Sequence, residues 1–223
     1  MTDQSSDTPV DLGAMYRQSR LRIAMMVDEA VSAIRVPATP AWDVHDVIAH
    51  LAGVVEDVKT GNLDGVTTDR WTAAQVERNR HRSVTELLDQ WAADAPMLED
   101  VLSSPKGAFA FRAVLDIHTH ECDLLNALGR PSSLPSPFLN WSGDWMRTNF
   151  EQSVVAAGLP VANPNVTDFD WFRGRLGRRS EAEVKAYAWP VDPTPYLDVW
   201  FIFGRAESSL DESSFGELSL SES

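Results

Sequence analysis

Apolar residues recur every three or four positions along much of the chain, which is the spacing of the buried face of an amphipathic α-helix. The pattern predicts helices over residues 10–34, 44–60, 69–80, 83–102, 109–128 and 140–158. Four long amphipathic helices joined by short links favour a helical bundle. The sequence therefore predicts a mostly α protein in which residues 10–160 form a four-helix bundle.

The second predicted helix has signals at both ends. Asp43 is suited to cap its first turn, with Asp46 three residues later to complete a capping box and Trp42 placed to pack on Val47. Gly61 follows the last apolar position and favours a helix stop.

The pattern changes after residue 160. Residues 169–189 predict two short helices, and residues 196–204 have the β-branched and aromatic content of a strand. We therefore expect residues 161–205 to form a small, shortened α/β C-terminal appendage. Residues 1–9 and 206–223 are polar, and the second segment is acidic and rich in serine, so both are predicted to be disordered tails.

The charge balance excludes several classes of partner. The chain carries 19 Lys and Arg against 33 Asp and Glu, a formal net charge of −14, so it has little positive charge to neutralise the phosphates of nucleic acids or anionic membranes. The longest apolar stretch, near residues 47–58, is interrupted by charges, and the polar N-terminus has no signal-peptide core. The single cysteine, Cys122, cannot form an internal disulfide and suits a reducing compartment. We expect a cytoplasmic monomer or homodimer with small-molecule partners.

Polar residues on the apolar faces of two predicted helices are candidates for a metal site. His50 lies on the core side of the second helix, and Asp116 and His120 lie one turn apart at one edge of the apolar arc of the helix 109–128. An imidazole from one helix and a carboxylate–imidazole pair from another can bind a divalent metal ion inside a bundle. Three protein ligands leave one coordination position open, as in catalytic sites.

Periodicity alone leaves other arrangements open. His118 lies at the opposite edge of the same arc and Glu121 near its middle, so His50, His118 and Glu121 form a rival ligand set. A buried histidine can also be a hydrogen-bonded core residue without a metal. His45 and His81 are expected at the surface.

Three segments of the chain resemble one family, in the same order. They are WDVHDVIAHLAGVVEDVKTGNLDGV, VLDIHTHECDLLNALGRP and FRGRLGRRSEAEVKAYAWPVDPTPYLDVWFIFG. They are similar to the mycothiol-dependent maleylpyruvate isomerase family of actinobacteria, which belongs to the DinB/YfiT-like superfamily of metal-binding four-helix bundles. The resemblance implies that His50, Asp116 and His120 bind a divalent metal, commonly zinc. It also implies that His118 packs in the core or supports a ligand. Asp123 lies on the same face as the ligands and is a candidate to orient a ligand imidazole.

The resemblance further implies a thiol-dependent activity. Mycothiol, or another low-molecular-weight thiol, would provide a metal-stabilised thiolate that attacks a small electrophile in an S-transfer or a cis–trans isomerisation. The alternatives are a metal-dependent hydrolase of the same fold and a non-enzymatic interaction or stress-associated module that its metal stabilises. No catalytic residue beyond the metal ligands is expected, and Cys122 is expected to be buried and inert.

Two groups of polar residues flank these motifs. The first follows the second predicted helix and is a candidate for the mouth of the site: Asn62, Trp71, Gln75 and Arg78. The second is the densest basic cluster of this acidic chain: Arg173, Arg175, Arg178 and Arg179. We interpret these arginines as charges at a helix end that pair with Glu181 and Glu183; the alternative is capture of a carboxylate from an acidic substrate or cofactor.

Overall fold

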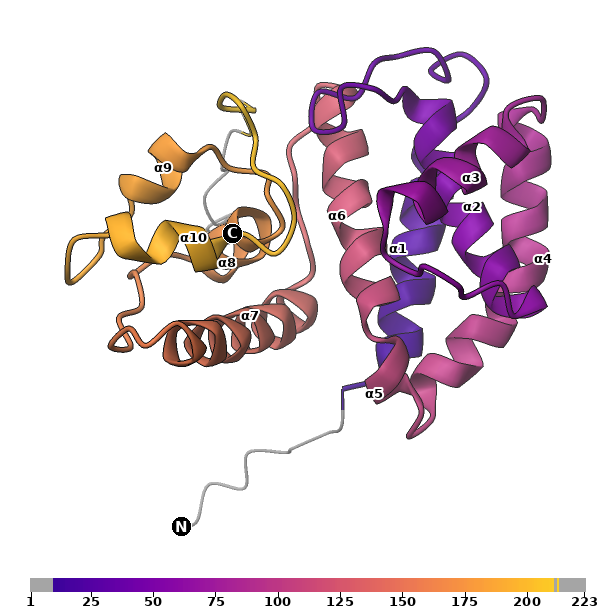
Figure 1. Ribbon diagram of the computed structural model, residues 1–223. Coiled ribbons are helices and arrows are strands. Elements are labelled where there is room, and N and C mark those ends of the chain that lie inside the picture. The colour runs from indigo at the N-terminus through magenta and orange to yellow at the C-terminus, as the bar shows by residue number, and fades with distance from the viewer. Residues whose placement is uncertain (1–9, 211, 213–223) are drawn as a thin grey trace, which may run out of the picture.

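The computed structural model describes residues 10–210 and 212 of the chain (Figure 1). The first unit contains α1 (Leu12–Met26), α2 (Val44–Thr60), α3 (Asp69–Asn79), α4 (Val84–Ser103), α5 (Gly107–Ala110) and α6 (Arg112–Ala127). The C-terminal unit contains α7 (Ser136–Ala156), α8 (Asp168–Arg175), α9 (Glu181–Lys185), the 3-10 helix η1 (Thr194–Tyr196) and α10 (Leu197–Trp200). Within the described ranges, β structure is limited to isolated bridges, so the predicted mostly α fold is confirmed.

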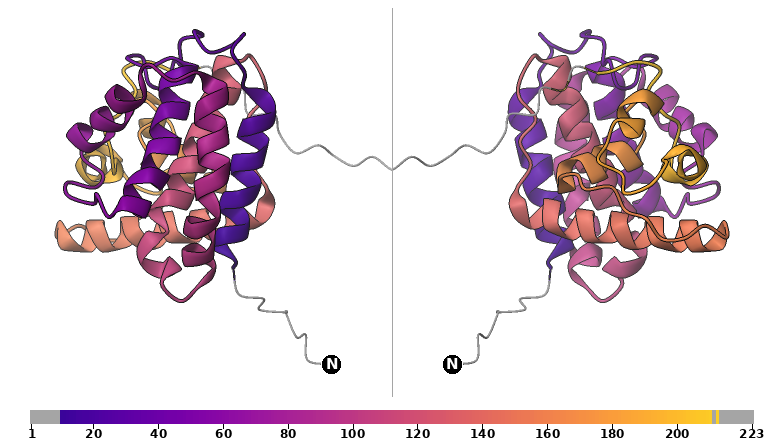
Figure 2. Two further views of the ribbon diagram at one scale, coloured as in Figure 1. Left: turned by 90° about the vertical axis from the view of Figure 1, so that its right-hand side faces the viewer. Right: turned by 90° about the vertical axis from the view of Figure 1, so that its left-hand side faces the viewer.

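The helices α1, α2, α4 and α6 lie side by side as a bundle, and α3 packs on α2 (Figure 2). The facing sides of the bundle are apolar and almost fully buried, as shown by Ile23, Ile48, Trp91, Leu98 and Ile117. Full burial of a side chain of this kind contributes about 1.5–3 kcal/mol, so this shared core is the main source of the bundle's stability. Among the described helices, none combines the length and the apolar character of a membrane span.

The first helix is shorter than predicted, because it ends at Met26 and not at residue 34. Val27 has an extended backbone (φ −120°, ψ 140°), and the Val36 N–H then donates to the Trp42 carbonyl at 3.1 Å. Val27 and Val36 are both buried. Apolar residues of a buried loop therefore continued the helical spacing, and periodicity cannot distinguish them from further turns of helix.

The ends of α2 follow the predicted signals. The Asp46 N–H donates to Asp43 Oδ1 at 3.0 Å and the Asp43 N–H donates to Asp46 Oδ2 at 3.3 Å, which completes the capping box. Gly61 has a left-handed backbone (φ 74°) and ends the helix. The predicted helix 109–128, in contrast, is divided at Phe111 into α5 and α6.

Short helices make up the C-terminal unit. The two short helices predicted over residues 169–189 are α8 and α9, but the strand predicted over residues 196–204 is wrong, since this segment begins with η1 and α10. Its aromatic residues pack around Trp200, whose ring centroid lies 4.9 Å from that of Trp171 and 5.1 Å from that of Phe150. Aromatic content reflects packing more than a backbone preference for strands, which explains the difference.

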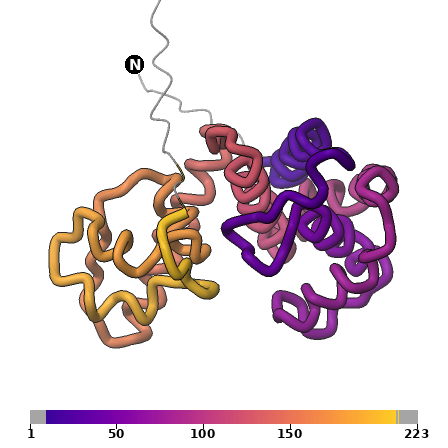
Figure 3. Tube along the Cα trace, turned by 90° about the horizontal axis from the view of Figure 1, so that it is seen from above, coloured from indigo at the N-terminus to yellow at the C-terminus, as the bar shows by residue number. Residues whose placement is uncertain are grey.

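The helix α7 connects the two units. It packs chiefly against α8 and also contacts α10, while Phe138 at its start stacks on His118 of α6 with ring centroids 3.7 Å apart. Seen from above, the chain passes from α6 directly into the C-terminal unit (Figure 3). Since α7 ends before residue 160 but packs chiefly on helices that follow it, the domain boundary at residue 160 stays a prediction.

The chain folds back onto the C-terminal unit after α10. Ala206 forms a bridge with Ser180, and the side chain of Glu212 is only 1% exposed. The predicted disorder of residues 206–223 therefore does not extend over residues 206–210 and 212. Residues 211 and 213–223, and the predicted N-terminal tail 1–9, lie outside the described residues.

Candidate metal centre

The side chains of His50, Asp116 and His120, called the triad below, converge between α2 and α6. One potential ligand atom from each lies within 4.8 Å of the other two. His50 Nε2 lies 3.2 Å from Asp116 Oδ2, and His120 Nε2 lies 3.7 Å from Asp116 Oδ1. The two imidazoles are buried, whereas the Asp116 side chain is 36% exposed. The carboxylate is thus the exposed member of a group whose other two members are buried rings.

A chain of polar contacts orients His50. Its Nδ1 lies 2.8 Å from Gln75 Oε1 of α3, and Gln75 Nε2 donates to Asp57 Oδ2 at 2.7 Å. Because the Gln75 amide gives its N–H to a carboxylate, its oxygen faces His50, and Nδ1 of the ring must carry the proton. Nε2 is then the nitrogen directed at Asp116, and its lone pair is the one that a metal ion would use.

His120 is oriented from the opposite side of the triad. Its Nδ1 lies 3.1 Å from Asp123 Oδ2; this is a close contact without the alignment of a hydrogen bond, and among the described residues Nδ1 has no aligned acceptor. Asp123 is completely buried and accepts hydrogen bonds from Arg173 Nη2 at 2.7 Å and Arg178 Nη2 at 2.8 Å. Residues of the C-terminal unit therefore help to fix the group that faces His120.

The electrostatics of the centre favour a cation between the two rings. Burial acts to lower the pKa of His50, but the neighbouring Asp116 carboxylate outweighs this effect, so the pKa lies above its ordinary value. Burial acts to raise the pKa of Asp116, and the adjacent His50 holds it below its usual range instead. Despite its burial, the Asp123 carboxyl has a pKa well below its usual range because of Arg178 and Arg173. Both carboxylates are therefore charged at neutral pH.

Trp42 belongs to the centre, although the sequence reasoning did not place it there. Its ring centroid lies 5.3 Å from that of His50 and 5.9 Å from that of His120, and the residue is half-buried. The ring forms an aromatic wall beside both imidazoles. Its position directly before the cap of α2 is the available signal, but that signal alone predicts only packing on Val47.

The two residues that occur only in the rival ligand set, His118 and Glu121, contact other elements. The ring of His118 stacks on Phe138 of α7, and burial lowers the pKa of His118 to about 3. Glu121 accepts hydrogen bonds from Arg22 Nε at 2.5 Å and from Ser19 Oγ at 2.6 Å, both on α1. Of the two arrangements left open by periodicity, the structure brings together the one with Asp116 and His120.

The four residues predicted at the mouth of the site belong to a hydrogen-bonded network that supports His50. Gln75 is fully buried in its contact with His50. Asn62 Nδ2 and Arg78 Nη2 both donate to Asp57 Oδ1 at 2.9 Å, and so hold the carboxylate that positions Gln75. Trp71 Nε1 donates to the Asn62 carbonyl at 3.0 Å.

The predicted pairing of the basic cluster with Glu181 and Glu183 is wrong: among the described residues, none of the four arginines forms an ion pair with either glutamate. Arg179 pairs with Asp170 and Glu212, and Arg175 donates to the Val199 carbonyl. Arg173 and Arg178 bind Asp123 instead. They lie 50 and 55 residues after Asp123 in the chain, so a local charge pattern could not reveal this contact. The cluster ties the C-terminal unit to α6.

The remaining histidines and the cysteine lie outside the triad. His45 is half-buried rather than exposed, with its Nε2 2.7 Å from the Arg82 carbonyl, whereas His81 is exposed as predicted. Cys122 is fully buried, as expected, and burial raises its pKa to about 12. It has neither the exposure nor the lowered pKa of a reactive thiol.

The donor set of the triad suits a divalent metal ion. Imidazole nitrogens and carboxylate oxygens are common ligands of zinc and related ions, and three protein ligands leave a position for water or a substrate. A second group with similar spacing, Asp43, His45 and Asp46, is also present, but its two carboxylates already serve the capping box of α2. The triad is therefore the stronger candidate.

Comparison with known proteins gives one family match. Residues 16–124 match the model of the mycothiol maleylpyruvate isomerase N-terminal domain, whereas no curated protein and no solved structure matches the chain. The matched segment runs from α1 nearly to the end of α6 and contains the whole triad. The family that the three sequence segments resemble is therefore the one whose model matches residues 16–124.

Proposed function

We propose that the chain binds one divalent metal ion, such as zinc, through His50, Asp116 and His120. We further propose that it promotes an S-transfer or cis–trans isomerisation of a small electrophile with mycothiol or a related low-molecular-weight thiol. The observation that carries the proposal is the convergence of two imidazoles and one carboxylate within 4.8 Å of one another. The name of the matching domain family, mycothiol maleylpyruvate isomerase, supports the choice of thiol and reaction class.

The partners of the two histidines support a role as ligands. His50 and His120 each direct Nε2 toward Asp116 and hold Nδ1 against another polar side chain, Gln75 or Asp123. A polar partner at Nδ1 orients a ligand imidazole, and a hydrogen-bonded one such as Gln75 also fixes its tautomer; loss of such a partner commonly costs about 10- to 100-fold in metal affinity. When bound, a metal ion with an open position stabilises the thiolate form of a thiol beside an electrophile.

The thiol of this reaction has to come from solution. The only cysteine of the chain, Cys122, is buried and has a pKa raised to about 12, so it cannot act as the nucleophile at neutral pH. The Trp42 ring offers a flat apolar surface beside the two imidazoles. A surface of this kind suits a conjugated or apolar part of a small electrophile.

Metal content tests the first half of the proposal. Untagged protein purified without chelator and reconstituted with zinc should hold about one equivalent by mass spectrometry, as a single three-ligand site predicts. His50→Ala should lose this metal, while the control His81→Ala, at an exposed histidine, should retain it. Equal metal in wild type and His50→Ala, or no metal in either, would exclude the site.

Turnover tests the second half. Metal-loaded protein would be assayed with α,β-unsaturated carbonyl compounds in the presence and absence of mycothiol or a thiol analogue. Consumption that requires both thiol and His50 supports the proposal. Hydrolysis of an ester or amide without thiol would favour a hydrolase instead, and tight metal binding without any turnover would favour a metal-stabilised module.

A further inference from the structure

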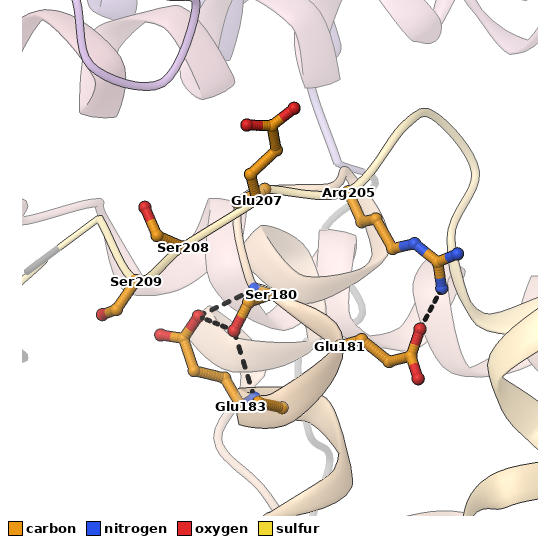
Figure 4. A pocket seen from close by; sticks show the side chains of 9 residues that line it. Ser180, Glu181, Glu183, Arg205, Glu207, Ser208 and Ser209 are labelled. Atoms are coloured by element: carbon orange, nitrogen blue, oxygen red, sulfur yellow. Dashed lines mark hydrogen bonds and ion pairs between the residues drawn. The ribbon is translucent and has the colours of Figure 1, made fainter.

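The end of the described chain, here called the tail segment (residues 205–210 and 212), crosses the start of α9. Arg205 pairs with Glu181, and Ala206 forms a bridge with Ser180. Figure 4 shows this crossing, where the tail segment and the start of α9 line a surface hollow. The side chain of Glu207 points away from the helix there.

Beyond this crossing, the tail segment returns to α6, to Arg173 of α8 and to Arg179, which follows α8. Asn126 Nδ2 of α6 donates to the Leu210 carbonyl at 3.2 Å. The buried Glu212 carboxylate accepts from Nε of Arg173 at 3.1 Å, from Nη2 of the same side chain, and from Nη1 of Arg179 at 2.5 Å. Charge-assisted bonds of this kind, two of them from one guanidinium fork, fix a carboxylate firmly.

Arg173 links Glu212 to the triad. Its guanidinium is fully buried and also donates through Nη2 to Asp123 Oδ1 at 2.7 Å. The other oxygen of Asp123 lies 3.1 Å from His120 Nδ1. A continuous series of contacts therefore runs from Glu212 through Arg173 and Asp123 to His120.

The position of Asp123 depends on whether its arginine partners also have another hydrogen-bond acceptor. Arg173 and Arg178 both bind Asp123, and Glu212 satisfies two further N–H groups of Arg173. Without the Glu212 carboxylate, the buried Arg173 would lack an acceptor for Nε, and an incompletely paired buried charge is unfavourable. Its remaining ion pair would draw Asp123 away from His120, and the excess positive charge would also oppose binding of a cation nearby.

We propose that Glu212 is a positioning residue of the metal centre, which acts through Arg173 and Asp123 on the ring of His120. This inference rests on the proposed function, because it assigns a role at the same site. The tail segment thus becomes part of the machinery that orients a ligand.

Zinc affinity of the full-length chain tests this role. The variant Glu212→Gln keeps the size of the side chain and removes its charge, so zinc affinity measured by competition with a chelating dye should fall about fivefold, less than for loss of a direct partner of a ligand. Glu212→Asp should recover part of the affinity. Long-range ¹H–¹⁵N spectra of the metal-free protein should show altered His120 ring signals in Glu212→Gln.

Two controls separate positioning from general stability. Glu207→Gln removes the charge of an exposed carboxylate of the same tail segment and should leave zinc affinity unchanged. Val154→Ala shortens a fully buried side chain of α7 and should lower the melting temperature without changing zinc affinity.

The outcomes separate this inference from the proposed function. Weaker zinc binding in Glu212→Gln, with shifted His120 signals and unchanged binding in both controls, supports the role of Glu212. Equal zinc affinity in Glu212→Gln and wild type overturns that role and leaves the proposed function intact. Failure of the wild type to bind zinc overturns the proposed function and the positioning role together.

Discussion

Two buried histidines stand two residues apart on α6 and have opposite surroundings. His120 lies beside Asp116 and Asp123, with its two ring nitrogens 3.7 and 3.1 Å from their carboxylates. His118 stacks on Phe138, and its Nδ1 lies 2.8 Å from the Val114 carbonyl of its own helix. One ring is surrounded by groups that stabilise positive charge, and the other by groups that exclude it.

The comparison shows that the elements packed against each side of α6 determine the chemical environment of its histidines. Of the two acidic neighbours of His120, Asp116 contacts His50 of α2, and Asp123 is held by arginines of the C-terminal unit. The neighbours of His118 come from α7 and are aromatic. Two rings of one residue type, both nearly inaccessible to solvent, therefore have different electrostatic surroundings.

The largest expected difference between the two rings is in metal binding. His120→Ala removes a proposed ligand and should lower zinc affinity by at least about 100-fold, because two remaining ligands hold zinc poorly. His118→Ala should keep one equivalent of zinc but lose about 2 kcal/mol of unfolding free energy, since it leaves a cavity beside Phe138. Zinc titration and urea unfolding of both variants provide the measurement. The reverse pattern would move the site to the other edge of α6.

The next difference concerns the buried carboxylates on the two sides of the helix. Asp123→Asn should weaken zinc binding about 10- to 100-fold, because the group that faces His120 Nδ1 loses its charge. The matched control is Glu121→Gln, which alters a buried carboxylate paired with Arg22. We expect this control to lower stability and to leave zinc affinity unchanged. Equal losses of affinity in the two variants would indicate that any buried charge in α6 affects the site.

The sequence predicted much of the bundle and of the triad. The spacing on α2 and α6 placed His50, Asp116 and His120 on or beside the apolar faces of their own helices, and the capping box of Asp43 marked the start of α2. Periodicity gives the direction of a side chain around its own helix axis, however, and not the element that it meets. Without the resemblance, His118 and His120 remained equivalent for this reason.

The parts that the sequence did not predict depend on distant contacts. Trp42 lies beside the two imidazoles because the loop before α2 is itself packed into the core through Val27 and Val36. Arg173 and Arg178 bind Asp123, which precedes them in the chain by 50 and 55 residues. No local pattern of charges or apolar residues encodes such pairings, which arise only when the two units pack together.

A smaller difference between the two rings should appear as a dependence of stability on pH. The pKa of His118 is lowered to about 3 by burial, whereas an unfolded chain has a histidine pKa near 6.5. The unfolded state therefore binds the extra proton first, and stability that is fully present above pH 6.5 is lost as the pH falls toward 3. Between pH 7 and pH 5, metal-free wild type should lose about 2 kcal/mol more than His118→Leu, as measured by urea unfolding. Identical losses would show that the ring of His118 is protonated within the folded protein.

The smallest expected effect concerns Cys122 of α6, which belongs neither to the triad nor to the contact between His118 and Phe138. Burial raises the pKa of its thiol to about 12, so at pH 8 only about one molecule in ten thousand carries a thiolate, and the side chain is also inaccessible. Native protein at pH 8 should therefore resist iodoacetamide for hours, urea-unfolded protein should react within minutes, and Cys122→Ala should bind zinc like wild type. Rapid labelling of the native protein would instead give the chain an accessible thiol two residues from His120, and the proposed reaction would no longer require a thiol from solution.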